Sequence, residues 1–144
     1  MVINMTVKQI SVFIENKVGG LATITDVLAK ADIDLRSMCI ADTSDYGIVR
    51  IIANDPQRAI EVLNKAGHTA NIRSVTAFAV PDCPGGLAKV LSILEENSVD
   101  IEYMYALVTT SVDKAYAVMR TDDDAKTEKI LLENNIELLD EAHI

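Results

Sequence analysis

Tryptophan is absent from this sequence of 144 residues, and aromatic residues make up only 4% of it. Apolar residues still reach 49%, so the core must be built mainly from aliphatic side chains. Basic residues are outnumbered, with 13 Lys and Arg against 22 Asp and Glu and a formal net charge of −9. Nucleic acids and anionic membranes both attract clustered Lys and Arg. The charge therefore argues against nucleic acid and against a membrane as partners.

Long hydrophobic runs are missing as well. No stretch approaches the roughly 18 apolar residues of a membrane-spanning helix, and the opening MVINMTVKQ does not have the form of a signal peptide. The two cysteines, Cys39 and Cys83, make no disulfide framework. These features predict a cytoplasmic protein with reduced thiols.

The patterns of common catalytic and metal sites are absent too. His68 and His143 are the only histidines, and their spacing with the cysteines is not that of zinc ligands. No nucleophile elbow, zinc-protease motif or phosphate-binding loop occurs. We interpret the acidic run at residues 122–124 as a helix cap, because Asp favours that position. We therefore expect a protein that is not an enzyme and has no cofactor and no metal.

What the sequence does contain is a repeat. Gly-Gly-Leu-Ala occupies residues 19–22 and again residues 85–88, an offset of 66 positions. The same offset pairs Leu28 with Leu94, and conservative apolar pairs continue along both halves. Because there are only two copies, the pattern indicates a duplication and not a solenoid.

Each copy predicts the same succession of elements. Strands are expected at residues 10–14, 33–41, 48–53 and 69–73, and again at 75–80, 99–109, 115–120 and 136–140. The first helix of each copy begins at Leu21 or Leu87, and Asp55, Pro56 and Gly67 mark the ends of the second helix of copy one. We place Tyr103 and Tyr105 on opposite faces of one strand. The βαββαβ order, repeated, predicts an α+β protein of two ferredoxin-like domains, residues 1–73 and 74–144, whose antiparallel sheets pack against helices.

The doubled order and the two Gly-Gly-Leu-Ala segments resemble the ACT domain family over nearly the whole chain. The segment beginning at Pro84 is the nearer match, because copy one has Val18 where proline is usual. The resemblance implies a stand-alone regulatory module that binds a small amino acid between paired domains. The loop after the first strand and the start of the first helix would supply the contacts. It also implies a homodimer, with a metabolic enzyme as a further partner.

The two glycine loops also suit such a ligand chemically. Paired glycines leave backbone N–H groups uncovered, and the first helical turn adds unpaired donors for a carboxylate. The alternative is structural, because glycine at a turn permits positive φ or tight packing. Asp34, Asp82 and Asp100 are candidate partners for the ligand's ammonium group. The predicted ligand-binding residues are Asn16, Lys17, Val18, Gly19, Gly20, Leu21, Ala22, Met38, Asp82, Cys83, Pro84, Gly85, Gly86, Leu87, Ala88 and Met104. Core packing is the stronger alternative for the two methionines.

Three functions stay open at this point. The first is a non-catalytic sensor that binds a small amino acid at the interface of two ACT-like domains. The alternative is an interaction module, for example a regulatory subunit of an amino-acid biosynthetic enzyme with no ligand of its own, for which apolar residues outside the core such as Phe13 would serve. The third is a small enzyme of unrecognised type, for which no converging cluster of residues is visible.

Overall fold

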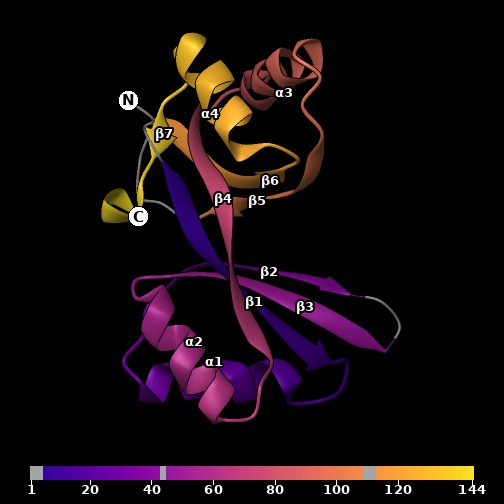
Figure 1. Ribbon diagram of the computed structural model, residues 1–144, viewed down its shortest axis with the longest axis vertical. Coiled ribbons are helices and arrows are strands. Elements are labelled where there is room, and N and C mark those ends of the chain that lie inside the picture. Colours follow the sequence, from indigo (N-terminus) through magenta and orange to yellow (C-terminus); the bar gives the residue numbers. More distant parts are fainter. Residues whose placement is uncertain (1–4, 43–44, 109–112) are drawn as a thin grey trace. The chain divides into compact units, whose positions relative to one another are not determined.

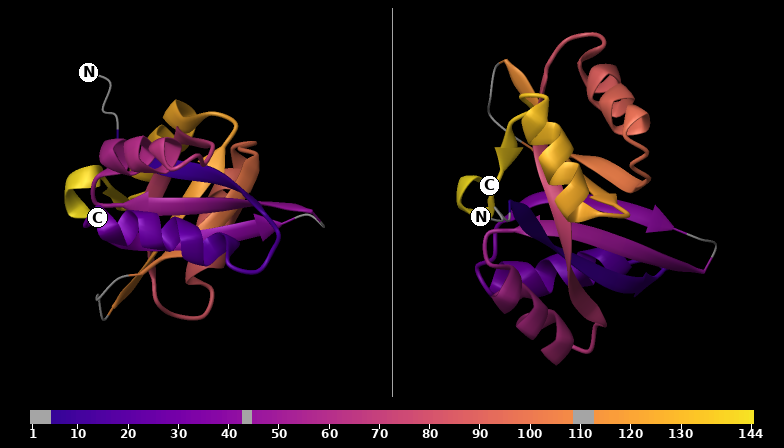
Figure 2. Two further views of the ribbon diagram at one scale, coloured as in Figure 1. Left: turned by 90° about the horizontal axis from the view of Figure 1, so that it is seen from below. Right: turned by 45° about the horizontal axis from the view of Figure 1, so that its top comes forward.

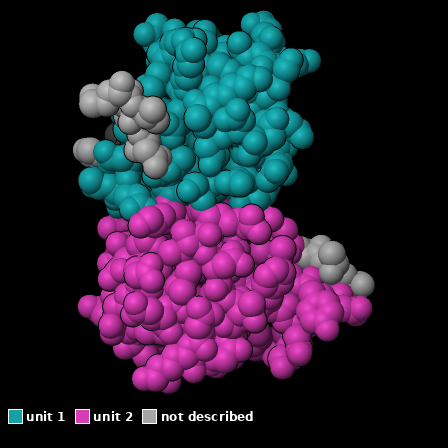
Figure 3. Space-filling view, in the orientation of Figure 1, with its two compact units in different colours: residues 1–7, 74–144 teal, residues 8–73 magenta. Residues whose placement is uncertain are grey.

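The structure is a computed structural model that describes residues 5–42, 45–108 and 113–144. The chain divides into two compact units (Figure 3): unit 2 is residues 8–73, and unit 1 is residues 1–7 together with residues 74–144. Two strands, β1 and β4, therefore contribute residues to both units, because the divisions fall inside them.

Unit 2 is built from one complete copy of the repeat (Figure 1). Its sheet has the order β4–β1–β3–β2, and β1 and β2 each pair with β3 in the antiparallel sense. Thr69, the residue just before β4, lies beside β1, because its carbonyl accepts a hydrogen bond from the Phe13 N–H at 3.0 Å. The elements are β1 (Thr6–Glu15), α1 (Gly20–Lys30), β2 (Leu35–Asp42), β3 (Tyr46–Ala53), α2 (Pro56–Lys65) and the first residues of β4 (Ala70–Pro81).

The core of unit 2 follows from the alternation of side chains along its strands. Ile10 and Val12 on β1 point to the same face and are fully buried, while Phe13, the residue after Val12, points to the other face and is 49% exposed. Both helices cover that face, with Leu28 of α1 and Leu63 of α2 buried against the strands. Figure 2 shows the two helices side by side. The expected exposure of Phe13 is confirmed.

Unit 1 repeats this plan with the second copy. Its sheet has the order β7–β4–β6–β5, again antiparallel. Phe78 of β4, Leu94 of α3 and Leu131 of α4 are fully buried in its core. The further elements are α3 (Gly86–Glu96), β5 (Ile101–Leu107), β6 (Lys114–Thr121), α4 (Asp124–Glu133), β7 (Leu138–Leu139) and a short 3-10 helix, η1 (Glu141–His143). The predicted pair of ferredoxin-like βαββαβ folds is confirmed.

The predicted helix signals also match the structure. Asp55 caps α2 by accepting a hydrogen bond from the Arg58 N–H at 3.1 Å, and Pro56 is the first helical residue. Gly67, just beyond α2, has φ of 92°. In the acidic run, Asp123 is the residue that caps α4, and it accepts from the Lys126 N–H at 3.1 Å. The interpretation of that run as a helix cap is confirmed.

Three local expectations were wrong. The strand expected at 136–140 is reduced to the two residues of β7, whereas the strands expected at 69–73 and 75–80 follow one another directly, as one strand, β4. Tyr103 and Tyr105 stack with ring centroids 6.5 Å apart, because residues two positions apart on a strand share a face. Met38 is 40% exposed rather than part of the core, since β2 is the edge strand of unit 2. Thr109, expected in a strand, lies outside the described residues.

Among the described residues, no helix is both long and apolar enough to span a membrane.

Candidate functional site

The first glycine of each motif is required by the backbone. Gly19 and Gly85 stand immediately before α1 and α3, with φ of 84° and 86°. This left-handed conformation costs a residue with a Cβ roughly 1–2 kcal/mol, and glycine adopts it freely. The structural interpretation therefore accounts for both residues.

The second glycine of each motif is required by space. A Cβ on Gly20 would lie 3.0 Å from the carbonyl oxygen of Glu15, and a Cβ on Gly86 would lie 2.2 Å from that of Pro81. The start of each helix is thus packed against the end of the preceding strand. The contact is closer in unit 1 than in unit 2.

The same turns leave hydrogen-bond donors unused. The Gly20 N–H donates to the Lys17 carbonyl at 3.2 Å, and the Gly86 N–H donates to the Cys83 carbonyl at 3.1 Å. The next two N–H groups of each helix, on residues 21–22 and 87–88, have no acceptor among the residues that the structure describes. The turn and the anion-binding surface are therefore compatible features of one segment.

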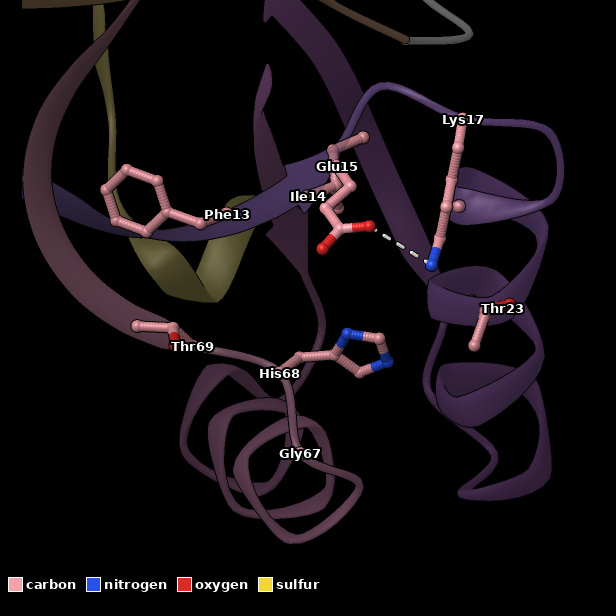
Figure 4. A pocket seen from close by; sticks show the side chains of 9 residues that line it. Phe13, Ile14, Glu15, Lys17, Thr23, Gly67, His68 and Thr69 are labelled. Atoms are coloured by element: carbon pink, nitrogen blue, oxygen red, sulfur yellow. Dashed lines mark ion pairs between the residues drawn. The ribbon is translucent and has the colours of Figure 1, made fainter. Parts of the chain in front are cut away.

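A pocket of about 360 Å³ opens beside this turn in unit 2, and we call it the unit 2 turn pocket. It lies between the first turn of α1 and the loop that follows α2 (Figure 4). Glu15 and Lys17 form an ion pair of 3.2 Å on one wall, and the His68 ring extends toward them from the loop after α2. Its lining residues are Phe13, Ile14, Glu15, Lys17, Gly20, Thr23, Gly67, His68 and Thr69.

Unit 1 has a pocket at the equivalent place, of about 440 Å³, which we call the unit 1 turn pocket. Gly86 takes the place of Gly20, and Asn135 takes the place of Gly67 at the end of the second helix. Asn135 has φ of 59°, so both second helices end in a left-handed residue that lines the pocket. Each copy of the duplicated fold therefore has a pocket beside its glycine turn.

The helix ends give each turn pocket charge of both signs. The N-terminus of α1 or α3 presents unpaired N–H groups and the positive end of a helix dipole. The C-terminus of α2 or α4, on the facing wall, presents the negative end of a helix dipole, and the carbonyls of residues 62–64 and 130–132 accept hydrogen bonds from the residues that follow each helix. The two helix ends therefore face the same pocket with partial charges of opposite sign. The field suits a zwitterion, which carries a carboxylate and an ammonium group.

A third pocket of about 320 Å³ lies on the other side of the second loop, within unit 1. We call it the Cys83 pocket. It brings together four predicted site residues, which are Asp82, Cys83, Leu87 and Met104. Tyr105 and Tyr116 complete part of its wall. Cys83 is an exposed free thiol.

The other predicted residues divide among these pockets unevenly. Lys17 and Gly20 line the unit 2 turn pocket, and Gly86 lines the unit 1 turn pocket. The remaining predicted residues line none of the three pockets: Asn16, Val18, Gly19, Leu21, Ala22, Met38, Pro84, Gly85 and Ala88. Asp34 and Asp100 follow the C-terminal ends of α1 and α3, the ends opposite to the glycine turns, so we do not place them at the site.

Sequence reasoning missed the residues that follow the second helices. His68 and Ile136 line the two turn pockets at equivalent positions, 68 residues apart, and neither belongs to a recognisable motif. The repeat itself was the available signal, because it places the loop after each second helix near the same turn. On another wall of the unit 1 pocket, Lys114 bonds to Glu137 at 2.6 Å, and this hydrogen bond raises the pKa of Lys114.

In the part of the chain that the structure describes, no group of three or more His, Cys, Asp or Glu residues is arranged to hold a metal ion. The acidic run is occupied by structural bonds: Asp122 accepts from the Asp100 N–H at 3.1 Å, and Asp124 pairs with Arg120 at 3.3 Å.

Residues 5–144 match the family model described as an ACT domain pair. Among solved structures, protein BT0572 from Bacteroides thetaiotaomicron is 41% identical, with a TM-score of 0.88, and the match covers 94% of this chain and 92% of that one. No curated protein matches the chain.

Two more distant structures share the fold. The regulatory subunit of aspartate kinase from Thermus thermophilus is 16% identical, with a TM-score of 0.69, over 92% of this chain and 93% of that one. The corresponding subunit from Thermus flavus is 17% identical, with a TM-score of 0.63, over 90% and 93%. At these identities the likeness concerns the fold alone. The family model, which spans nearly the whole chain, carries the assignment: this chain belongs to the family of ACT domain pairs.

Proposed function

We propose that this protein is a non-catalytic regulatory protein that binds a small amino acid at its Gly-Gly-Leu-Ala turns. The supporting observation is the pair of equivalent turn pockets, each lined by the first turn of one helix and by the residues that follow the end of another. The carboxylate of the ligand would lie at the positive N-terminal end of the first helix and its ammonium at the negative C-terminal end of the second. The fold that this chain shares with regulatory subunits of aspartate kinase is consistent with this role.

Regulation would follow if the ligand prefers one state of the protein over another. An ACT-domain pair offers such states through the arrangement of its domains or through its oligomer. We propose residues 1–73 and 74–144 as the two ACT repeats. A ligand position between paired domains, a homodimer and a cytoplasmic location stay predictions.

The test is calorimetry with each of the twenty amino acids at concentrations up to the millimolar range. Ala22 and Ala88 are exposed residues in the first turns of α1 and α3. We expect Ala22→Glu or Ala88→Glu to weaken binding about tenfold or more, because a carboxylate there repels that of the ligand and competes for the same N–H groups.

Matched controls are Ala22→Gln and Ala88→Gln, which have the same size without the charge. The glutamate variants should fold normally, because an acidic residue is favourable in the first turn of a helix. If no amino acid binds the free protein, or if both glutamate variants bind as the wild type does, the proposal is wrong.

Docking on a partner protein is a second candidate function, favoured by the edge strand β2. Met38 and Ile40 lie on the helix-covered side of the unit 2 sheet, opposite Ile51 and Val49 in register, yet they are 40% and 46% exposed. Exposed apolar residues on an edge strand are typical of contact surfaces. Co-purification with a metabolic enzyme, together with no response to amino acids, would favour this function over the first.

A further inference from the structure

The two turn pockets differ at equivalent positions of their inner walls. In unit 2 the wall has Glu15 from the end of β1 and His68 from the loop after α2. In unit 1 those positions are Pro81 and Ile136, so both polar side chains are replaced by apolar ones. The duplicated fold therefore presents a polar pocket in one unit and a more apolar pocket in the other.

The floor of the unit 1 turn pocket continues this apolar character. Val80 and Val90 line it and are only 7% and 1% exposed, so they join the pocket to the core of unit 1. Ile136 also packs against that core. The side chains of these residues offer no hydrogen-bond partner to a polar side chain of a ligand. Burying an aliphatic side chain against them would be favourable, because its apolar surface would be removed from water.

Charged groups are confined to the remaining walls of the same pocket. These groups are Asp113, Lys114, Glu137 and Lys89, of which Lys114 and Glu137 form an ion pair of 2.6 Å. Lys89, in the first turn of α3, takes the place of Thr23 and forms no ion pair with any described residue. A cation at the positive end of a helix is unfavourable by itself. A bound carboxylate would relieve that repulsion.

We propose that the unit 1 turn pocket binds an amino acid with an aliphatic side chain, which contacts Val80, Val90 and Ile136 while Lys89 binds its carboxylate. This inference rests on the proposed function, and it names the ligand class of one of the two pockets. The pocket volume of about 440 Å³ is within the range typical of small-ligand sites. Each ligand methylene buried on the apolar wall should lower the Kd about fourfold.

The experiment is a titration of the ¹⁵N-labelled full chain, followed by the shifts of its backbone amide resonances. The ligands are glycine, alanine, 2-aminobutyrate and valine, with threonine as the isostere of valine. We expect the Kd to fall along the aliphatic series and valine to bind about tenfold more tightly than threonine. The shifting amides should belong to residues 79–80, 89–90 and 134–137, since Pro81 has no N–H.

Two variants test the assigned residues. Lys89→Thr, at an exposed position, introduces the residue of copy one and should weaken valine binding about tenfold with little effect on folding. Ile136→His should remove the preference for valine over threonine, and thermal unfolding checks that it folds. The control is Lys17→Ala, which alters the unit 2 turn pocket and should leave valine binding at unit 1 unchanged.

The outcomes separate the two proposals. If amino acids bind but threonine equals valine, or if the shifts fall on residues 13–15 and 67–69 or around Cys83, the inference is overturned while the proposed function stands. If no amino acid shifts any resonance, both fail. Unchanged valine binding by Lys89→Thr would also overturn the inference.

Discussion

Replacing Gly86 with alanine should destabilise the protein clearly, while the matched replacement at Gly20 should have little effect. The Cβ added at Gly86 would lie 2.2 Å from the Pro81 carbonyl oxygen, more than 1 Å inside an ordinary contact of about 3.5 Å. That carbonyl cannot move easily, because it accepts a hydrogen bond from the Cys83 N–H at 2.9 Å and Pro81 is paired with Lys114 of β6.

The magnitude follows from two opposing effects. Overpacking costs about 1–3 kcal/mol, and we take the upper part of this range because the clash is with a fixed backbone atom. Exchanging glycine for alanine in a helix stabilises the helix by up to about 1 kcal/mol, because alanine has the higher helix propensity. The net loss in the free energy of unfolding is therefore about 2 kcal/mol. At Gly20 the Cβ would be 3.0 Å from the Glu15 oxygen, so a small shift suffices and the two effects nearly cancel.

The assay is urea unfolding followed by far-UV circular dichroism. With a slope of about 2 kcal/mol per molar, Gly86→Ala should lower the midpoint by about 1 M and Gly20→Ala by much less. Equal midpoints for the two variants would refute the reasoning, because the closer approach of residue 86 to the Pro81 carbonyl would then have no effect on stability.

Three further predictions concern helix ends and a buried acid. Asp123→Ala and Asp55→Ala should each lower the free energy of unfolding by about 1 kcal/mol, measured in urea, because each removes a helix cap; Asp26→Ala, in mid-helix, is the control. Gly67→Ala should cost about 1 kcal/mol, because its φ of 92° strains alanine, and unchanged stability would contradict this. Burial raises the pKa of Glu128 above its ordinary 4.5, so the folded state binds the proton more strongly than the unfolded state. The free energy of unfolding should therefore fall as pH rises above about 4.5. Glu128→Gln should flatten this decline, measured by urea unfolding at a series of pH values.

Much of the fold was predictable because local chemistry and tertiary packing agree. The apolar alternation of β1 and the signals at Asp55, Pro56 and Gly67 specify elements that the core then uses. The edge position of β2 was not predictable, since the sequence of Met38 and its neighbours reads as a buried strand whichever place the strand takes in the sheet. Local pattern determines an element, whereas its exposure depends on what packs beside it.

The candidate site was predictable only on one of its walls. The glycine motif identified the turn, and the structure supplies a separate reason for each glycine. His68 and Ile136 were missed because they reach the same pocket from a loop almost 50 residues later in each copy. Nothing local in their sequence shows that they face a helix N-terminus. The two residues occupy equivalent positions in the duplicated fold, and one is polar whereas the other is apolar.

The sharing of β1 and β4 between the units has a consequence for how the chain can fold. Met5 packs against the core of unit 1, and its N–H donates to Glu128 at 3.2 Å. The ribosome makes Met5 long before it makes α4, so this segment must wait while residues 8–73 assemble around the rest of β1. Unit 2 can therefore form during synthesis, whereas unit 1 closes only when its earliest and latest segments meet.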